Sequence, residues 1–394
     1  MKIKNSPSGT LRQRIGYAAF LPHPLPPKIN WSLDLVNALS KADHVLGKLS
    51  GEGHKLPNPH VLIRPFMERE AVLSSRIEGT QAELGEVLAA DAGLLLGHVK
   101  DLQEVRNYIA ALEYGLERLH TLPVSLRLLR EIHTRLMQGV RGQHATPGEF
   151  RMTQNWIGAP GASLSMAKYV PPPPEDLMSC LDAFEKFLHS QQLPLLVHLG
   201  LCHYQFEALH PFVDGNGRLG RLLIILLLIE RKALAAPLLY LSAFFERTRE
   251  EYYQHLFNVS ALGTWEAWLL YFLKGVSLEA ADALSRAERI NHVLSDWRLK
   301  AAELRSGVPA RIIECLAVNP FLNIPHVASH LKIAFNTAHR AVQKLEALGI
   351  VSPMAYPGRA GATFYCADAL FEALKAPVDL TRFAALGVDL PRPE

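Results

Sequence analysis

Long apolar segments, paired cysteines and a large excess of one charge are all missing from this chain of 394 residues. Its longest uninterrupted apolar run, Leu222 to Ile229, has eight residues, whereas a helix that spans a bilayer needs about 20. Prolines interrupt the apolar stretch near the N-terminus, so the core of a signal peptide is also missing. We therefore expect a cytoplasmic protein that does not enter a membrane.

The four cysteines lie far apart without any C-x-x-C pair, which argues against zinc fingers and a disulfide framework. The formal net charge is only +3, from 41 basic and 38 acidic residues, so any basic site must be local. Glycine and proline number 26 each without a period, and 49% of the residues are hydrophobic. These values exclude a collagen-like or disordered chain and allow a large core.

Most of the chain shows helical periodicity, and its length suggests more than one domain. Helices are expected over 31–49, 65–78, 102–119, 125–139, 177–189, 194–209, 221–232, 242–258 and 265–304, the last of them broken near Gly275. The exception is 146–174, where strand formers and turn residues mix. We expect a β-hairpin there, closed by a run of four prolines.

A composition change near Ser306 marks a second, smaller domain. Its pattern predicts helices over 311–319, 324–331 and 336–348 and strands over 350–355 and 363–366, an order that resembles a winged helix. In that fold the third helix enters the major groove of DNA. The candidate DNA contacts are Asn336, Thr337, His339, Arg340 and Lys344 on this helix and Arg359 on the wing. Six basic against four acidic residues over 301–370 are weak for phosphate binding, so protein contact is an equal alternative.

One segment, 210–221, has the sequence H-P-F-V-D-G-N-G-R-L-G-R. It contains G-x-G-x-x-G, but a dinucleotide-binding site would need a strand before it and an acidic residue after a second strand, and neither is expected here. A glycine-rich loop before a buried helix instead presents backbone N–H groups to an anion, of which phosphate is the natural example.

The side chains of the same segment fit phosphate chemistry. Arg218 and Arg221 are three residues apart, so both can reach one phosphate group. Asp214 offers the hard oxygen ligand that Mg²⁺ favours, and His210 can accept a proton from an attacking hydroxyl. Their occurrence together favours a functional site over a structural role for each residue alone.

At every fixed position, 210–221 matches H-P-F-x-D/E-G-N-G-R-x-x-R, so the chain resembles the Fic family. The resemblance implies a mainly α-helical core with a short β-hairpin flap, plus the small C-terminal winged helix. It implies a nucleotidyltransferase that moves AMP from ATP, with Mg²⁺, onto a Ser, Thr or Tyr hydroxyl of a protein, including itself. His210 would be the general base, Asp214 the Mg²⁺ ligand and Phe212 a packing anchor. The implied nucleotide-binding residues are Gly215, Asn216, Gly217, Arg218, Gly220 and Arg221.

Two further elements resemble parts of the family. Ser74 to Gly79 fits the inhibitory pattern [S/T]-x-x-x-E-[G/N], and residues four apart share a helix face. In the family such a glutamate, here Glu78, pairs with the second loop arginine, here Arg221, and blocks the seating of the terminal phosphate. The segment from Gly158 to Tyr169 stands where the family has a flap that docks an extended target segment by strand addition.

The expected domains are an inhibitory N-terminal helical region (1–120), a catalytic core (121–275), a connecting helix (276–305), the winged helix (306–375) and a tail (376–394). We also expect a homodimer, and the sequence leaves open whether Glu78 acts within one chain or across the dimer. Two alternatives to the AMP transferase remain. The site either removes AMP from a protein or transfers another phosphate-containing group, with Glu78 placing a water. Otherwise the chain is an ATP-sensing transcriptional regulator, which an intact His210 argues against.

Overall fold

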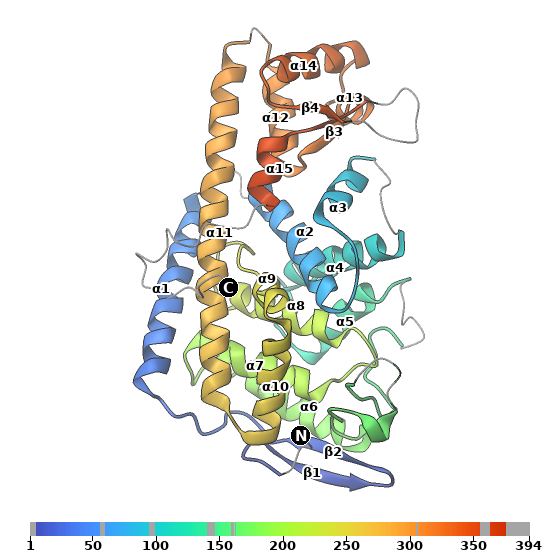
Figure 1. Ribbon diagram of the computed structural model, residues 1–394, viewed down its shortest axis with the longest axis vertical. Coiled ribbons are helices and arrows are strands. Elements are labelled where there is room, and N and C mark those ends of the chain that lie inside the picture. Colours follow the sequence, from blue (N-terminus) through green and yellow to red (C-terminus); the bar gives the residue numbers. More distant parts are fainter. Residues whose placement is uncertain are drawn as a thin grey trace.

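The computed structural model describes residues 5–55, 60–93, 99–139, 146–158, 161, 163–304, 306–354 and 363–375. Helices dominate this part of the chain, and two small antiparallel sheets lie at opposite ends of the molecule (Figure 1). The prediction of a mainly α-helical fold is therefore confirmed. Within the described residues, no helix is both long and apolar enough to cross a membrane.

The N-terminal part contains β1 (Gly9–Arg14), β2 (Tyr17–Pro22), α1 (Leu33–Lys55), α2 (His60–Ile77), α3 (Leu84–Asp91) and α4 (Val99–Arg118). The central part contains α5 (Leu126–Leu136), a 3₁₀ turn η1 (Leu164–Met166), α6 (Pro174–Leu188), α7 (Leu195–Leu209), α8 (Asn216–Glu230), α9 (Ser242–Arg247) and α10 (Arg249–Leu262). The C-terminal part contains α11 (Trp265–Ala302), α12 (Val308–Val318), β3 (Phe321–Asn323), α13 (Ile324–Leu331), α14 (Phe335–Ala347), β4 (Ser352–Met354), β5 (Phe364–Cys366) and α15 (Asp368–Lys375).

Helix α8 forms the centre of the core. Its run from Leu222 to Leu228 is buried throughout, because α4, α5 and α7 pack around it. A helix that is apolar on every side is stable only in such a central position. The helix begins at Asn216 rather than at the predicted Arg221, so the second half of the glycine-rich loop is its first helical turn.

Helix α11 runs along the length of the molecule from the core to the C-terminal domain (Figure 1). The predicted break near Gly275 is wrong, because the helix is continuous for 38 residues. A Cβ on Gly275 would lie 2.5 Å from the ring of Phe244, so this glycine permits close packing of α9. The chain does break at Thr248, between α9 and α10, where one helix was predicted.

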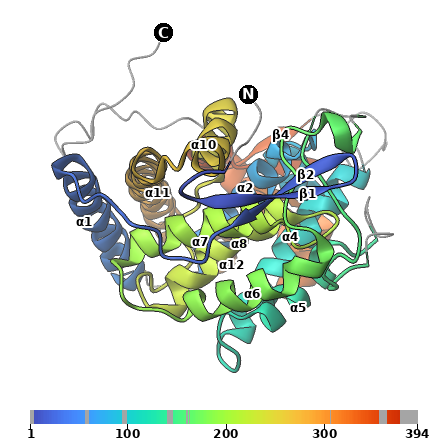
Figure 2. The same cartoon turned by 90° about the horizontal axis from the view of Figure 1, so that it is seen from below.

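The predicted β-hairpin over 146–174 is also wrong in its extent. Within the described residues of this segment, the pairing is a single bridge between Ile157 and Tyr169. Side chains take the place of a partner strand: Arg151 donates to the carbonyl of Pro172 (Nη2–O 2.5 Å), and Gln154 donates to that of Pro171 (Nε2–O 3.1 Å). A hairpin that was not predicted does occur earlier, at β1 and β2, and ends at the first of the prolines within 22–27. It lies across this end of the core and contacts α7 (Figure 2).

The C-terminal domain contains the predicted helix-turn-helix pair α13 and α14 beside α12, and it adds two unpredicted elements. Strand β3 joins β5 and β4 in a sheet of order β3-β5-β4, and α15 packs on α11. Four of the candidate DNA contacts, Asn336, Thr337, Arg340 and Lys344, are exposed on α14, whereas His339 is half-buried beside Phe335. The predicted wing residue Arg359 and the tail over 376–394 lie outside the described residues.

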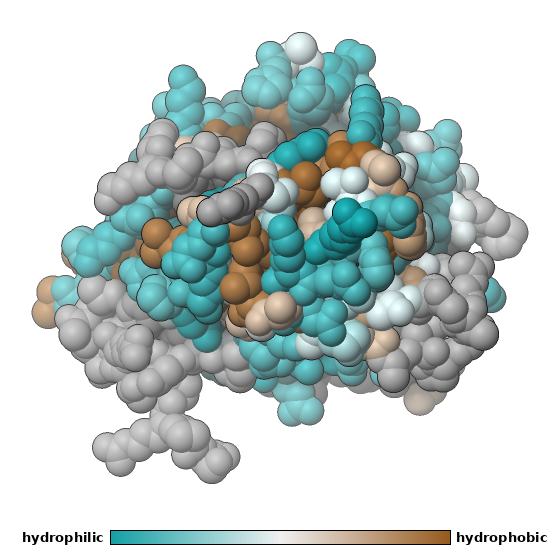
Figure 3. All heavy atoms as spheres, turned by 90° about the horizontal axis from the view of Figure 1, so that it is seen from above, coloured by the Kyte–Doolittle hydropathy of each residue, from teal (hydrophilic) through white to brown (hydrophobic). Residues whose placement is uncertain are grey.

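Hydrophilic residues cover most of the end of the molecule where this domain lies, with hydrophobic residues between them (Figure 3). One of the exposed hydrophobic side chains is Phe335, at the start of α14 and 52% exposed. The opposite face of α14 is buried through Ala338, Ala341, Val342 and Leu345. The outward face of α14 is therefore exposed among the described residues. Its side chains do not indicate which kind of partner would bind there.

Candidate active site

The loop between α7 and α8 is held in one conformation by its own side chains. Helix α7 ends at His210, whose φ of 46° turns the chain out of the helix. Asn216 then closes the loop, because its Oδ1 accepts from the N–H of Phe212 (2.9 Å) and its Nδ2 donates to the carbonyl of Phe212 (2.8 Å). The side chain of Asn216 thus stabilises the loop. The residue contributes to an anion site only through its position in the first turn of α8.

A buried histidine on α5 supports the same loop. His133 Nδ1 accepts from the N–H of Gly148 (2.8 Å), so its proton is on Nε2, which donates to the carbonyl of Asp214 (2.9 Å). Its ring stacks on Phe212 with centroids 3.8 Å apart. Burial lowers the pKa of His133 to about 4, so the ring stays neutral and keeps this tautomer. No sequence motif pointed to this residue.

Arg151 fixes the other side of the loop. Its buried guanidinium donates from Nε to the carbonyl of His210 (2.9 Å) and from Nη2 to that of Pro172 (2.5 Å). Its own N–H donates to the carbonyl of Pro211 (3.0 Å). One side chain therefore joins the loop to the flap segment, a role that was not predicted.

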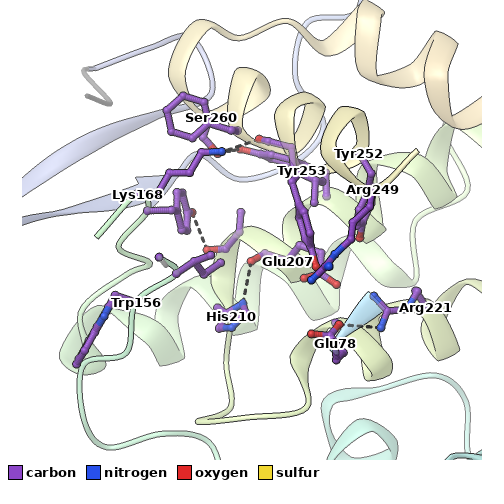
Figure 4. A pocket seen from close by; sticks show the side chains of 18 residues that line it. Glu78, Trp156, Lys168, Glu207, His210, Arg221, Arg249, Tyr252, Tyr253 and Ser260 are labelled. Carbon is purple, nitrogen blue, oxygen red and sulfur yellow. Dashed lines mark hydrogen bonds and ion pairs between the residues drawn. The ribbon is translucent and has the colours of Figure 1, made fainter. Parts of the chain in front are cut away.

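His210 opens into a cavity of about 570 Å³ between α7, α8, α10 and the flap segment (Figure 4). The residues that line it are Glu78, Trp156, Ile157, Gly158, Lys168, Tyr169, Tyr204, Glu207, Ala208, His210, Gly217, Arg221, Arg249, Tyr252, Tyr253, Leu256, Phe257 and Ser260. The structure thus brings together six of the predicted site residues, from three separate segments: Glu78, Gly158, Tyr169, His210, Gly217 and Arg221.

The imidazole of His210 is suited to accept a proton. Burial lowers its pKa to about 4, so the ring is neutral near pH 7. Its Nδ1 lies 3.4 Å from the carbonyl oxygen of Glu207, which can only accept a hydrogen bond. A proton on Nδ1 therefore leaves Nε2 able to act as a base.

Arg221 is bound by the predicted inhibitory residues of the same chain. Its Nη2 donates to Glu78 Oε1 (2.8 Å) and to the carbonyl of Ser74 (2.9 Å), and its Nε donates to Ser74 Oγ (2.8 Å). Burial opposes charge on both partners of the ion pair, but their mutual attraction outweighs it. The pKa of Glu78 is therefore lowered and the pKa of Arg221 is raised. The contact between Glu78 and Arg221 forms within one chain in this structure.

Other predicted residues lie beside the cavity rather than on its wall. Arg218 is buried, with Nη1 3.4 Å from Glu104 Oε2 and Nη2 3.8 Å from Met137 Sδ. Asp214 is exposed, and its Oδ1 accepts from the N–H of Gly215 (2.6 Å). A Cβ on Gly215, whose φ is 76°, would lie 2.7 Å from Met137 Sδ, so this glycine meets a steric need of the loop.

Several cavity residues escaped the sequence analysis. Glu207 precedes the loop on α7, and one face of α10 supplies Arg249, Tyr252, Tyr253 and Leu256. The α10 residues recur at helical spacing, which is visible in the sequence but equally typical of a helix that packs on a core. Only the fold shows that this face borders a cavity.

Comparisons with known proteins agree with this geometry. The family model described as "Fic/DOC family" matches residues 123–228, and the one described as "Fic/DOC family N-terminal" matches residues 36–117. The protein adenylyltransferase Fic of Drosophila grimshawi is 32% identical over 163 residues, which are 39% of this chain and 31% of that protein. The corresponding protein of Drosophila melanogaster is 34% identical over 114 residues, 27% of this chain and 20% of that protein. The chain thus spans about a third or less of the length of these curated relatives.

Solved structures show the same fold. A Fic family protein from Desulfovibrio desulfuricans G20 aligns with a TM-score of 0.57 at 21% identity, over 87% of this chain and 98% of that one. Fic-1 from C. elegans aligns with a TM-score of 0.51 at 22% identity, over 64% of this chain and 74% of that one. With both domain matches in the expected order and the loop built as described, the chain belongs to the Fic/DOC family.

Proposed function

We propose that this protein transfers AMP from ATP to a hydroxyl group of a protein, and that Glu78 holds it in an inhibited state. The observation that carries the proposal is the position of Glu78 at the N-terminus of α8. There its carboxylate binds Arg221 in the same cavity as His210. Helix N-termini attract anions, so an internal carboxylate stands where a nucleotide phosphate would bind.

The cavity suits a nucleotide in size and chemistry. Its volume of about 570 Å³ falls within the range of roughly 300–1,000 Å³ that is usual for small-molecule sites. Arg221 supplies a cationic end for phosphates beside the helix N-terminus at Gly217, and Tyr253, Leu256 and Phe257 form an aromatic and apolar wall for a base. Arg249 reaches toward Glu78 and Arg221 (Figure 4) and adds a second cation at the phosphate end.

The reaction would be in-line transfer. Neutral His210 takes the proton of the target hydroxyl as its oxygen forms a bond to the α-phosphorus, and the bond to the bridging oxygen breaks to release pyrophosphate. The backbone N–H groups at the start of α8 stabilise the developing negative charge, and this electrostatic contribution and positioning supply most of the rate. The flap segment at Ile157 and Gly158 would present the target, since both border the cavity.

Asp214 fits a metal that is bound mainly by the substrate. Its exposed carboxylate is at the loop, and the described residues contain no cluster of three acidic, histidine or cysteine side chains that could hold a metal alone. Mg²⁺ in phosphate-transfer sites usually takes one or two carboxylates and completes its shell with phosphate oxygens and water. Asp214 would supply that carboxylate, and the bound ion would neutralise phosphate charge.

The ion pair of Glu78 also bears on the direction of the reaction. Removal of AMP would require a base for water, and a carboxylate whose pKa is lowered by Arg221 is a weak base. A carboxylate that stays ionised beside Arg221 is, in contrast, an effective competitor of phosphate. We therefore favour Glu78 as a brake on transfer.

Intact-mass spectrometry after incubation with ATP and Mg²⁺ tests the proposal on the wild type, Glu78→Gly, and Glu78→Gly combined with His210→Ala. We expect one or more AMP groups on Glu78→Gly, fewer on the wild type and none on the double variant. ATP binding to the same proteins, measured by calorimetry, is the control for a protein that binds ATP but modifies a target other than itself. A folded Glu78→Gly protein that gains no AMP and binds ATP no better than the wild type would contradict the proposal.

A further inference from the structure

Glu207 is an acidic residue in the cavity to which the reaction assigns no role. It lies on α7, one turn before His210, and lines the cavity. Within the described part of the chain its Oε1 has no hydrogen-bond partner and almost no accessible surface. A Cβ on Gly220 would overlap this oxygen, so the absence of a side chain in α8 makes room for the carboxyl group.

An orphaned buried oxygen is unfavourable for the protein alone. Buried polar groups nearly always have a hydrogen-bond partner, and those that lack one in a native structure require an explanation. An apolar side chain would fill the same space between α7 and α8 without that cost. Because Oε1 itself has almost no accessible surface, a ligand in the cavity would hydrogen bond to the other carboxyl oxygen of Glu207 and so offset part of this cost.

The cavity also shows which part of a nucleotide would meet Glu207. Arg249 extends toward Glu78 and Arg221 at one end, whereas Lys168 and Ser260 lie at the opposite end (Figure 4). Glu207 lies between these ends, near His210. In a nucleotide the ribose lies between phosphates and base. With phosphates at Arg221 and the base on the wall of α10, the ribose is next to Glu207.

We propose that the side chain of Glu207 hydrogen bonds to a ribose hydroxyl of the bound nucleotide and so selects ribonucleotides over deoxyribonucleotides. This inference rests on the proposed function, because it assumes that the cavity binds ATP. It adds a specificity residue that the loop motif does not contain.

The protonation state of Glu207 suits this role. Burial raises its pKa to about 8, although Arg221 acts in the opposite direction. Near pH 7 the carboxyl group is therefore protonated, so that it can both donate to and accept from a hydroxyl group. A neutral group also avoids the repulsion that a carboxylate would exert on the phosphates. The charged and titratable groups around it are His210 at the C-terminal cap of α7, Arg221 on α8, Glu78 just after α2, and Arg249, Tyr252 and Tyr253 on α10.

The test measures binding of ATP, 2′-dATP and 3′-dATP by calorimetry with EDTA, so that no transfer occurs. The full-length parent is Glu78→Gly, and Glu207→Ala, Glu207→Gln and Glu250→Gln are each added to it. Glu250 is exposed in the first turn of α10 and controls for loss of a nearby charge. We expect the parent to bind ATP about tenfold more tightly than one of the deoxy analogues, which corresponds to about 1.4 kcal/mol.

Glu207→Ala should lower ATP affinity to that of the disfavoured analogue and leave the affinity for this analogue unchanged. Glu207→Gln, which still donates and accepts, should keep most of the preference, and Glu250→Gln should match the parent. An equal loss for all three nucleotides, or no loss, would overturn the inference and leave the proposed function intact. Failure of the parent to bind any nucleotide would overturn both.

A pH series covers the case in which Glu207→Ala does not fold. As the pH rises to 9 the parent should lose ATP affinity because Glu207 ionises, beginning at a lower pH than in the wild type since Glu78 no longer raises the pKa of Glu207; Glu207→Gln, which cannot ionise, should lose less. The same loss in both proteins would overturn the inference, because the neutral carboxyl group would then have no part in binding.

Discussion

Gly217 and Glu78 share one space at the N-terminus of α8. A Cβ on Gly217 would overlap Glu78 Oε1, and the carboxylate that occupies this space also binds Arg221 Nη2 at 2.8 Å. A glycine is therefore needed here whichever anion is bound, the internal carboxylate or a nucleotide phosphate. Under the proposed function, Glu78 and a nucleotide phosphate would compete for this space, so a single side chain would control the site.

Gly217→Ala should abolish AMP transfer in the wild type and in Glu78→Gly. The added methyl group excludes phosphate from the helix N-terminus just as it excludes Glu78. We expect the Kd for ATP of Glu78→Gly to rise at least tenfold, measured by calorimetry, while the melting temperature changes little because the site is open to the cavity. Unchanged ATP affinity would show that phosphate does not approach Gly217.

Ser74→Ala should weaken the brake without removing it. The change takes away the acceptor of Arg221 Nε and leaves the contact with Glu78 in place. A buried hydrogen bond to a charged group contributes about 1.5–3 kcal/mol, so Arg221 should become easier to draw toward phosphate. We expect self-modification at a rate between those of the wild type and Glu78→Gly, measured by incorporation of labelled AMP.

Ser75→Ala is the matched control, since the neighbouring hydroxyl group is also buried but has no hydrogen-bond partner, Arg221 included, among the described residues. A rate for Ser74→Ala no higher than that of Ser75→Ala would argue against a role for Ser74 in inhibition.

The ion pair between Glu78 and Arg221 predicts a particular pH dependence of stability. The pKa of Glu78 is lower in the folded protein than the usual 4.5, so the pair stabilises the fold fully above that pH. Its contribution is lost as the pH falls through the lowered pKa. The difference in melting temperature between the wild type and Glu78→Gln should therefore shrink as the pH falls below 4.5. A difference that stays the same below pH 4.5 would contradict this assignment.

Sequence reasoning went furthest where chemistry is local in the chain. The loop from His210 to Arg221 carries its predicted base, its glycines and its second arginine within one segment, and Ser74 and Glu78 are only four residues apart at the end of α2. These positions could be predicted without the fold, and the structure brings His210, Arg221 and Glu78 into one cavity.

The remainder depends on partners that are distant in sequence. In the sequence Gly275 predicted a helix break. The structure shows that the glycine is needed because a side chain there would collide with Phe244. A hairpin was predicted for the flap segment because nothing in the sequence indicates that the side chain of Arg151 donates a hydrogen bond to the carbonyl of Pro172. Glu207 has no motif of its own, and only the packing of α7 against α8 shows that its carboxyl oxygen is buried without a partner.

The C-terminal domain should influence the brake through α3, the helix that follows Glu78 in the chain. Asn319 Nδ2 donates to the carbonyl of Leu88 (2.8 Å), and Asn323 Nδ2 donates to that of Ala92 (2.7 Å). The carbonyl of Leu88 also accepts from the N–H of Ala92 (3.2 Å), so Asn319 adds a second donor there, whereas Asn323 binds the carbonyl of Ala92 just beyond the end of α3. Apolar residues of α3 also pack against β3 and β5, so the segment that carries Glu78 is anchored at both ends.

Asn319→Ala combined with Asn323→Ala should loosen this anchor and raise self-modification above the wild-type rate. Each lost bond is worth about 1 kcal/mol, so partial activation is expected rather than the full effect of Glu78→Gly. Asn336→Ala, on the exposed face of α14, is the control and should leave the rate unchanged. A fall in melting temperature together with an unchanged rate of AMP incorporation would mean that these bonds stabilise the domain contact without reaching Glu78.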